Sequence, residues 1–413
     1  MPRDTVRAYR PAGGVSGRRA YAQSEPPTAR RDYPECVNFD LSPEHELVRD
    51  TVRRFAVQRV APVAEELDRE HRFPYALVAE LGTLGLMGMP IPERYGGAGA
   101  DTLSYAIAIE ELTRVDSSVA ITVAAHTSLG TTPILLFGSE EQRERWLPPL
   151  ASGSRLAAFG LTEPAAGSDA GATRTRAERR GDDWVINGSK IFITNAGTDI
   201  SACVTITALT GEGEISNLIV PNGTPGYDIS PPLAKLGWRA SDTRELSFHD
   251  CAVPAQNLLG ERGQGYAQFL QILDGGRISV AAMGVGLAQG AYDLAYAYAQ
   301  EREQFGRPIS KFQAVQFKLA DLATELEAAR TLVHKAAWLK DTGRPFGAAA
   351  AMAKLYSGEL SNRAVNWALE IHGGYGYMDE YPISRLYRDQ KILEIGEGTN
   401  EVQRLVIARH LGL

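Results

Sequence analysis

The residue best placed for acid–base chemistry is Glu397, which stands between two glycines in the stretch DQKILEIGEGTNEVQR (389–404). Thr399 and Asn400 follow, and either is a good N-cap for the amphipathic run EVQRLVIARHL. We therefore expect Glu397 in a loop just before a helix begins. The glycines free the backbone and place no side chain beside the carboxylate, which could then act as a general base. On this segment alone, a solvated Glu in a Gly-rich turn is the alternative.

Three further stretches could hold a ligand. AFGLTEPAAGSD (158–169) and EIHGGYGYM (370–378) are rich in small residues, which let backbone amides approach a bound group. Thr162 and Ser168 add hydroxyls to the first of these stretches. In LDGGRIS, Asp274 and Arg277 are spaced i, i+3, which is most often an ion pair on a helix surface.

Together these motifs resemble those of acyl-CoA dehydrogenases, flavoenzymes that oxidise an acyl-CoA thioester to its trans-2-enoyl form. The resemblance runs from about Leu41 to the C-terminus and suggests a member of the short-, medium- or branched-chain type. The excess of Arg over Lys along the whole chain suggests a bacterial source. It implies FAD as cofactor, acyl-CoA as substrate, an electron-transfer flavoprotein as electron acceptor, and no metal. It also implies a role in the catabolism of fatty acids or branched-chain amino acids.

The resemblance assigns roles to individual residues. Glu397 would take the α-proton while the β-hydrogen leaves as hydride to the flavin. The thioester oxygen would be held by a ribityl hydroxyl and the Glu397 amide. In one branch of the family the base stands just before the arginine that aligns with Arg277, but here that residue is Gly276, which cannot serve. The implied flavin-binding residues are Phe159, Leu161, Thr162, Ser168, Phe192, Ile193, Thr194, Arg302, Phe305, Gln313, Gly373, Gly374 and Thr399. The implied substrate-binding residues are Ser168, Asp274, Arg277 and Gly398.

Within EREQFGRPISKFQAVQF, the resemblance implies that Arg302, Phe305 and Gln313 reach the cofactor of a neighbouring subunit. A guanidinium suits a pyrophosphate as a fixed charge with several donors. We therefore expect a homotetramer built as a dimer of dimers.

Three positions depart from the pattern of the family. Phe192 stands where relatives usually carry Trp, and its ring can still stack on a flavin. Glu370 replaces a usual Gln, and its carboxylate would face phosphate charge unless it is protonated or turned away. Gly396 replaces a usual Tyr, which leaves volume for a bulkier or branched acyl group unless a neighbouring aromatic ring fills it. Gly396 could also require a positive φ angle.

The elements that must position these residues follow an α-β-α order. We predict a mainly α fold with a central β domain and a C-terminal four-helix bundle, divided into a disordered leader (1–36), a helical domain (37–155), a β domain (156–264) and a bundle domain (265–413). Ser42 and Pro43 begin the first helix, Pro62 should kink it, and Asn187-Gly188 predicts a β-hairpin turn. GVGLAQG (284–290) lies inside a helical run, so we interpret its glycines as helix-packing residues rather than a dinucleotide fingerprint.

Composition narrows the class further. At 413 residues, two or three domains are expected, and a net charge of -7 argues against non-specific nucleic-acid binding. Three separated cysteines and scattered histidines favour free thiols and no zinc site. No apolar run is expected to reach the ~20 residues of a membrane span. The leader has no secretion signal, so we expect a cytoplasmic protein, or a mitochondrial matrix protein if the Arg-rich leader is a transit peptide.

Other activities of the same fold remain open. These are oxygen-using acyl-CoA oxidases and N-hydroxylases, biosynthetic enzymes acting on carrier-protein thioesters, and a non-catalytic assembly factor. Intact flavin and base motifs make the assembly factor the weakest of these alternatives. The sequence does not fix the length or branching of the acyl group.

Overall fold

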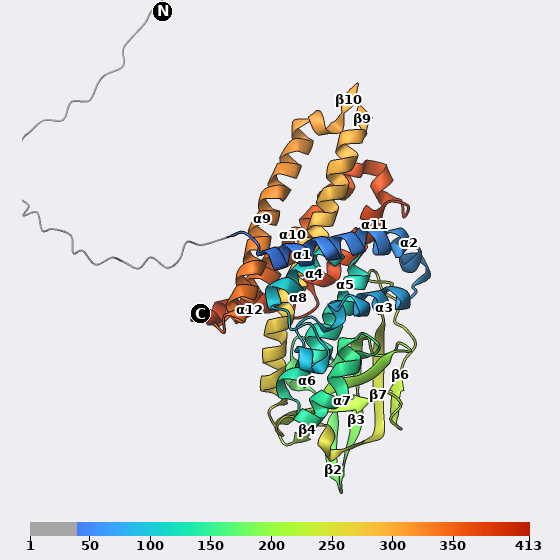
Figure 1. The fold of residues 1–413 in the computed structure, drawn as a ribbon, viewed down its shortest axis with the longest axis vertical. Helices are drawn as coiled ribbons and strands as arrows, with labels where there is room; N and C mark the ends of the chain where they lie inside the picture. Colours follow the sequence, from blue (N-terminus) through green and yellow to red (C-terminus); the bar gives the residue numbers. More distant parts are fainter. Residues whose placement is uncertain (1–38) are drawn as a thin grey trace, which may run out of the picture. The chain divides into compact units, whose positions relative to one another are not determined.

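The computed structural model describes residues 39–413, so the leader predicted for residues 1–36 lies outside the described residues. Residues Leu41–Leu413 form one body. Along the chain this body has helices, then strands, then helices again (Figure 1). This order confirms the predicted fold class, mainly α with a central β domain.

The first helix begins as expected. Ser42 caps α1 (Pro43–Phe55) by accepting a hydrogen bond from the His45 amide, and Pro43 takes the first helical position. A π-helical turn (Ala56–Val60) then leads into α2 (Ala61–Glu70). Pro62 has no N–H to continue the α-helical ladder, and it lies just after this π turn, at the start of α2. The kink expected at Pro62 stays a prediction. The remaining helices before the sheet are α3 (Tyr75–Thr83), α4 (Thr102–Thr113), α5 (Ser117–Ala124), α6 (Thr132–Phe137) and α7 (Glu140–Ala151).

One stretch differs from the expectation about apolar runs. Ser117–Phe137, which joins α5 and α6 through a second π-helical turn, is long and apolar enough to cross a membrane. Its most apolar window is 78% buried within the fold, and Val119 and Ile134 are fully buried. We therefore interpret it as a core helix that supports the site.

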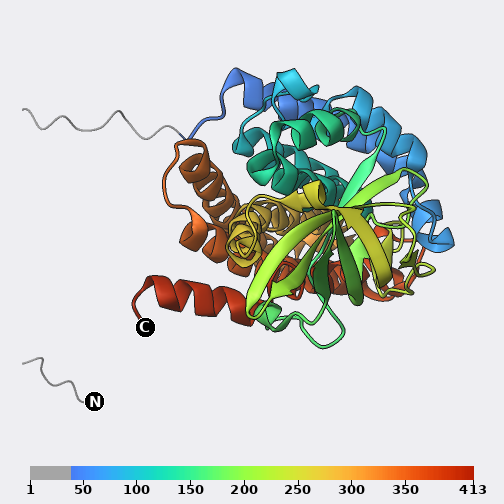
Figure 2. The same cartoon turned by 90° about the horizontal axis from the view of Figure 1, so that it is seen from below.

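The central domain is a single eight-stranded sheet in which β1 joins β4 in parallel and most other pairs are antiparallel. Its strand order is β6-β7-β3-β2-β4-β5-β8, with β1 pairing β4 off this path. Figure 2 shows the strands fanning out, with the first helices (blue to teal) along one side and the last helix (red) along another. The strands are β1 (Leu156–Gly160), β2 (Arg176–Arg180), β3 (Asp183–Thr194), β4 (Ser201–Gly211), β5 (Glu214–Pro221), β6 (Tyr227–Ile229), β7 (Thr243–Pro254) and β8 (Leu258–Leu259).

The predicted hairpin turn at Asn187-Gly188 is wrong. These residues lie inside the continuous strand β3, where they form a bulge against β7. Asn187 exchanges two hydrogen bonds with Asp250, and Gly188 is needed because a Cβ there would lie 2.5 Å from Thr175 Oγ1. Long-range pairing therefore overrides the local turn preference, and the actual turn between β2 and β3 falls at Gly181, whose φ is 61°.

The C-terminal part contains the four long helices that the periodicity predicts: α8 (Gly265–Glu301), α9 (Gln313–Asp341), α10 (Gly347–His372) and α12 (Asn400–His410). Helix α10 packs against each of the other three. This part also contains a short helix, α11 (Pro382–Gln390). A short antiparallel hairpin joins α8 to α9 and consists of β9 (Glu303–Gln304) and β10 (Arg307–Pro308).

Small residues bring α8 close to its neighbours, as the GVGLAQG motif predicted. A Cβ at Gly286 would lie 2.2 Å from the Glu110 carbonyl oxygen, and one at Gly290 would lie 2.2 Å from the Arg114 carbonyl oxygen. Since these positions are helical, the dinucleotide interpretation is excluded. This close packing fixes the position of α8 along α4. It therefore also fixes which residues of α8 face Glu397.

Candidate active site

Glu397 lies in the loop that the sequence predicted. Thr399 caps α12 by accepting a hydrogen bond of 3.3 Å from the Val402 amide. Glu397 has a φ of 56° and Gly398 a φ of 85°, so both adopt the left-handed conformation. This conformation is uncommon for a glutamate. The suggestion that Gly396 needs a positive φ is wrong, because the left-handed residues are the two that follow it.

The carboxylate of Glu397 is buried at its tip. Its Oε2 is inaccessible to solvent and has no hydrogen-bond partner among the described residues. Burial raises the pKa of Glu397 to about 7, against the opposing effects of the Arg277 and Lys354 charges. The Glu397 amide also makes no hydrogen bond within the described part of the chain. An unpaired carboxylate oxygen and a free N–H on one residue suit proton abstraction beside a developing oxyanion.

Helix α8 supplies the opposite wall of this site. A Cβ on Gly276 would lie 2.9 Å from Glu397 Oε2 and 3.8 Å from Leu129 Cδ2. Arg277 is buried, forms an ion pair with Asp274, and acts electrostatically on Glu397. The i, i+3 ion pair is therefore present, but its Arg277 side is buried, whereas the Asp274 side chain is 36% exposed. Their predicted role in binding substrate stays a prediction.

The stretch after β1 is tied to β3 by a buried ion pair that sequence reasoning missed. Lys190 Nζ donates to Glu163 Oε1 at 2.8 Å and to the Leu161 carbonyl at 3.2 Å, and Lys190 is fully buried. Burial alone would raise the pKa of Glu163, but the Lys190 charge and several hydrogen bonds lower it to about 2. The Ile191 amide also donates to the Thr162 carbonyl at 2.9 Å. These contacts hold the two predicted flavin-contact stretches, the one after β1 and the one at the end of β3, next to each other.

The side chains predicted to contact the flavin in these stretches differ in solvent exposure. Phe159 is buried and Leu161 half-buried in a small apolar cluster with Phe269 and Ile272 of α8. Ser168 is exposed, whereas Thr162 is half-buried.

At the end of β3, Phe192 has a φ of 63° and is 64% exposed, so its ring is available for stacking. Ile193 is buried in the core of the sheet, so only its backbone could meet a cofactor. Thr194 is half-buried.

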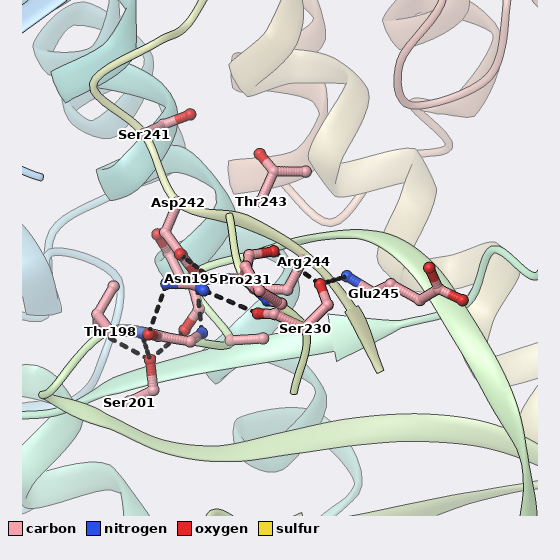
Figure 3. A network of polar contacts seen from close by, with 12 residues as sticks. Asn195, Thr198, Ser201, Ser230, Pro231, Ser241, Asp242, Thr243, Arg244 and Glu245 are labelled. Carbon is pink, nitrogen blue, oxygen red and sulfur yellow. Dashed lines mark hydrogen bonds and ion pairs between the residues drawn. The ribbon is translucent and has the colours of Figure 1, made fainter. Parts of the chain in front are cut away.

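A polar network fixes the backbone just beyond Thr194 (Figure 3). Arg244 donates to the carbonyls of Ser230 at 2.8 Å and Gly197 at 2.9 Å, and it pairs with Asp242. Ser201 Oγ donates to the Asn195 carbonyl at 2.6 Å. These contacts give the segment after the flavin motif one defined shape.

A second group of predicted residues gathers elsewhere. Arg302, Gly373 and Gly374 line a cavity of about 530 Å³, together with Tyr298, Gln304, Ile309, Ile371, His372, Tyr375 and Met378. A Cβ on either glycine would meet nothing within 4 Å, so the backbone is open to a ligand. Phe305 is 93% exposed at the turn between β9 and β10, and Gln313 is exposed at the start of α9. Neither residue lines the cavity.

Two neighbouring side chains bind the Glu370 carboxylate. Lys318 forms an ion pair with its carboxylate, and Asn366 Nδ2 donates to it at 3.0 Å. The hydrogen bond from Lys318 holds the pKa of Glu370 below its usual value. The carboxylate is therefore ionised, compensated by Lys318, and outside the lining of the cavity.

Models of a known protein family match three consecutive parts of the chain. Family models described as the N-terminal, middle and C-terminal domains of acyl-CoA dehydrogenase match residues 42–154, 158–251 and 263–412. A probable acyl-CoA dehydrogenase of Bacillus subtilis is 54% identical, covering 91% of this chain and 100% of the relative. The chain belongs to the acyl-CoA dehydrogenase family.

Other similar proteins carry more specific names. A short-chain specific acyl-CoA dehydrogenase of Clostridium acetobutylicum is 47% identical, covering 90% of this chain and 99% of the relative. The solved structure of butyryl-CoA dehydrogenase from Megasphaera elsdenii has a TM-score of 0.89 and 43% identity, covering 91% of this chain and all of that one. A structure titled for the electron transferring flavoprotein of Acidaminococcus fermentans also has a TM-score of 0.89, with 46% identity and coverage of 91% and 99%.

Acyl-CoA dehydrogenases are FAD enzymes, and FAD is the cofactor of this chain. The residues present fit it. The exposed ring of Phe192 suits a flat ring system, and the cavity offers a guanidinium from Arg302 beside the open backbone of Gly373 and Gly374 for a pyrophosphate. Among the residues that the structure describes, no group of three or more His, Cys, Asp or Glu side chains could hold a metal ion.

Proposed function

We propose that this acyl-CoA dehydrogenase oxidises a short-chain acyl-CoA thioester to the trans-2-enoyl-CoA, with Glu397 as the base. The observation that carries the proposal is the buried, unpartnered Oε2 of Glu397, on a residue whose pKa is raised to about 7. A general base works best when its pKa lies near the working pH. The names of the Clostridium and Megasphaera relatives support a short acyl group.

The α-proton of a thioester is too weakly acidic for an ordinary carboxylate in water, so the site has to stabilise the enolate as it forms. Glu397 removes the α-proton, and its own amide N–H is free to donate to the thioester oxygen. Arg277 is buried and acts electrostatically on Glu397, so it favours negative charge in the site. Bound FAD would supply the acceptor for the β-hydrogen, which leaves as hydride. The glycine at position 276 leaves room for the carboxylate itself, since a Cβ there would lie 2.9 Å from Oε2.

We also propose that two copies of the chain share each cofactor site. Arg277 lies about a third of the way along α8 and Arg302 caps its C-terminal end, so 25 residues of helix, roughly 37 Å, separate them. This separation exceeds what one FAD can bridge between its ring and its pyrophosphate. The cavity lined by Arg302 therefore serves the flavin of a neighbouring copy, which supports a pair of chains, and we propose that two such pairs form a homotetramer, a dimer of dimers.

An electron-transfer flavoprotein is the electron acceptor that we propose, and the Acidaminococcus structure supports it. The test is a panel of acyl-CoA esters from four to sixteen carbons, assayed anaerobically with an artificial acceptor and then with an electron-transfer flavoprotein. We expect the highest kcat/KM on butyryl-CoA or a branched four- or five-carbon ester. Turnover only on carrier-protein thioesters, or rapid flavin reoxidation by oxygen, would replace the proposal with one of the alternative activities.

A further inference from the structure

Helix α10 places a buried cation next to the loop that carries the base. Lys354 is 1% exposed, and its Nζ donates to the Gly398 carbonyl at 2.8 Å and to Asn400 Oδ1 at 3.2 Å. Within residues 39–413 it forms no ion pair with a carboxylate. Burying an ammonium group is costly without strong compensation, so its position calls for a function.

The contacts of Lys354 act on the strained part of the loop. Glu397 and Gly398 both have left-handed backbones, and a left-handed glutamate persists only where the surroundings hold it. Gln403 of α12, which is fully buried, donates from Nε2 to the Glu397 carbonyl at 3.2 Å and to the Gly398 carbonyl at 2.9 Å. The Gly398 carbonyl therefore receives donors from two helices at once.

Lys354 also belongs to the electrostatic surroundings of the carboxylate. Arg277 on α8 and Lys354 on α10 oppose the effect of burial on Glu397. Tyr105 on α4 also interacts with Glu397, and burial raises its pKa, so it stays neutral. Besides Glu397, the carboxylates of Glu394 and Glu401 favour the charged form of Lys354. Burial lowers the pKa of Lys354 to about 8, so it is charged at neutral pH. Two cations therefore favour the ionised form of the base.

We propose that Lys354 is a positioning residue for the base: it fixes the Gly398 carbonyl, and thereby the left-handed Glu397, and its charge favours the ionised carboxylate. This inference rests on the proposed role of Glu397. The hydrogen bonds and the charge have separable consequences. Loss of the hydrogen bonds displaces the carboxylate and lowers kcat, whereas loss of the charge raises the pKa of Glu397 and moves the acid limb of the pH profile to higher pH.

The experiment compares Lys354→Met, Gln403→Leu and the control Lys391→Met with the parent enzyme as FAD-loaded proteins. Lys391 precedes the same loop but pairs with Glu394 and contacts neither Glu397 nor Gly398. The measurements are kcat and KM for butyryl-CoA from pH 5.5 to 9, FAD content and Tm. We expect Lys354→Met to lose about a hundredfold in kcat with little change in KM, and its acid limb to shift upward. Gln403→Leu should lose kcat with the limb unmoved, since it removes no charge. Lys391→Met should match the parent.

Wild-type kcat and an unmoved acid limb in a folded, FAD-loaded Lys354→Met enzyme would overturn the inference. If that variant does not fold, Lys354→Gln replaces it, because its amide can still donate a hydrogen bond while the charge is lost, and an acid limb unmoved from that of the parent would overturn the inference. Glu397→Gln, measured alongside, separates the two claims. If it keeps wild-type turnover, the proposed function fails. If it is inactive while Lys354→Met is normal, only the positioning role fails.

Discussion

The carboxylate of Glu397 lies directly against the backbone of Gly276, where a Cβ would be 2.9 Å from Oε2. The two positions at which a base is expected in this family, one on the loop before α12 and one on α8, therefore converge on the same point. A side chain at position 276 and the carboxylate of Glu397 compete for one volume.

Gly276→Ala should lower activity without loss of stability. Replacing a helix-interior glycine by alanine favours the helix by about 0.5–1 kcal/mol, and the flexible end of Glu397 can move away from the new methyl group. A displacement of about 1 Å can cost roughly a hundredfold in rate. The control is Gly275→Ala, whose methyl group would meet only Lys340 Nζ at 3.4 Å. Equal kcat values for the two variants, with equal Tm, would contradict the convergence.

Lys190→Met should destabilise the protein. The change leaves the Glu163 carboxylate buried without its cation and frees the Leu161 carbonyl. Removing one partner of a buried pair costs about 3–5 kcal/mol, and we expect FAD retention to fall as the stretch after β1 loosens. The double variant Glu163→Gln/Lys190→Met should recover part of this loss, because no buried charge is left unpaired. Urea unfolding of the three proteins measures the effect. A single variant within 1 kcal/mol of the parent would show that the pair does not hold the stretch.

Arg302→Ala should weaken retention of FAD, since it removes the guanidinium from the cavity beside Gly373 and Gly374. The matched control is Arg307→Ala on the same turn, whose guanidinium lies 4.4 Å from the centroid of the Phe312 ring and outside the cavity lining. Gel filtration followed by flavin absorbance gives the bound fraction for each protein. Light scattering on the parent enzyme should give a tetramer, and a monomer with stoichiometric FAD would refute a shared cofactor site.

Gly396→Tyr should fold, because Gly396 is not left-handed and a new Cβ, 3.3 Å from the Ile392 carbonyl oxygen, requires a shift of only a few tenths of an ångström. The added ring would occupy space beside the acyl group, and overpacking a fitted pocket costs about 1–3 kcal/mol. We therefore expect a lower kcat/KM for isobutyryl-CoA relative to butyryl-CoA, with Gly396→Ala close to the parent. An unchanged ratio in a stable Tyr variant would mean that this volume does not contact the acyl group.

The sequence predicts what depends on local chemistry. Thr399 precedes an amphipathic run, and this local pattern was enough to predict that it caps α12. The glycines on either side of Glu397 predict a loop in the same way, because backbone flexibility and the lack of adjacent side chains depend only on neighbouring residues. The contacts that hold the site are long-range. Lys190 and Glu163 are 27 residues apart, and Lys354 is 44 residues from Gly398, so no local pattern marks either lysine. The turn predicted at Asn187-Gly188 is wrong for the same reason, because long-range pairing of β3 with β7 outweighs the local turn preference.

The most direct test of the account is anaerobic bleaching of the flavin by butyryl-CoA in Glu397→Gln, followed by stopped-flow absorbance. The amide keeps the size of the side chain and removes the base, so FAD content and binding of butyryl-CoA should stay near those of the parent. A positioned general base contributes roughly a hundred- to ten-thousand-fold in rate, and we predict that bleaching slows by at least a hundredfold. Bleaching at the parent rate would contradict the assignment of Glu397 and require another base.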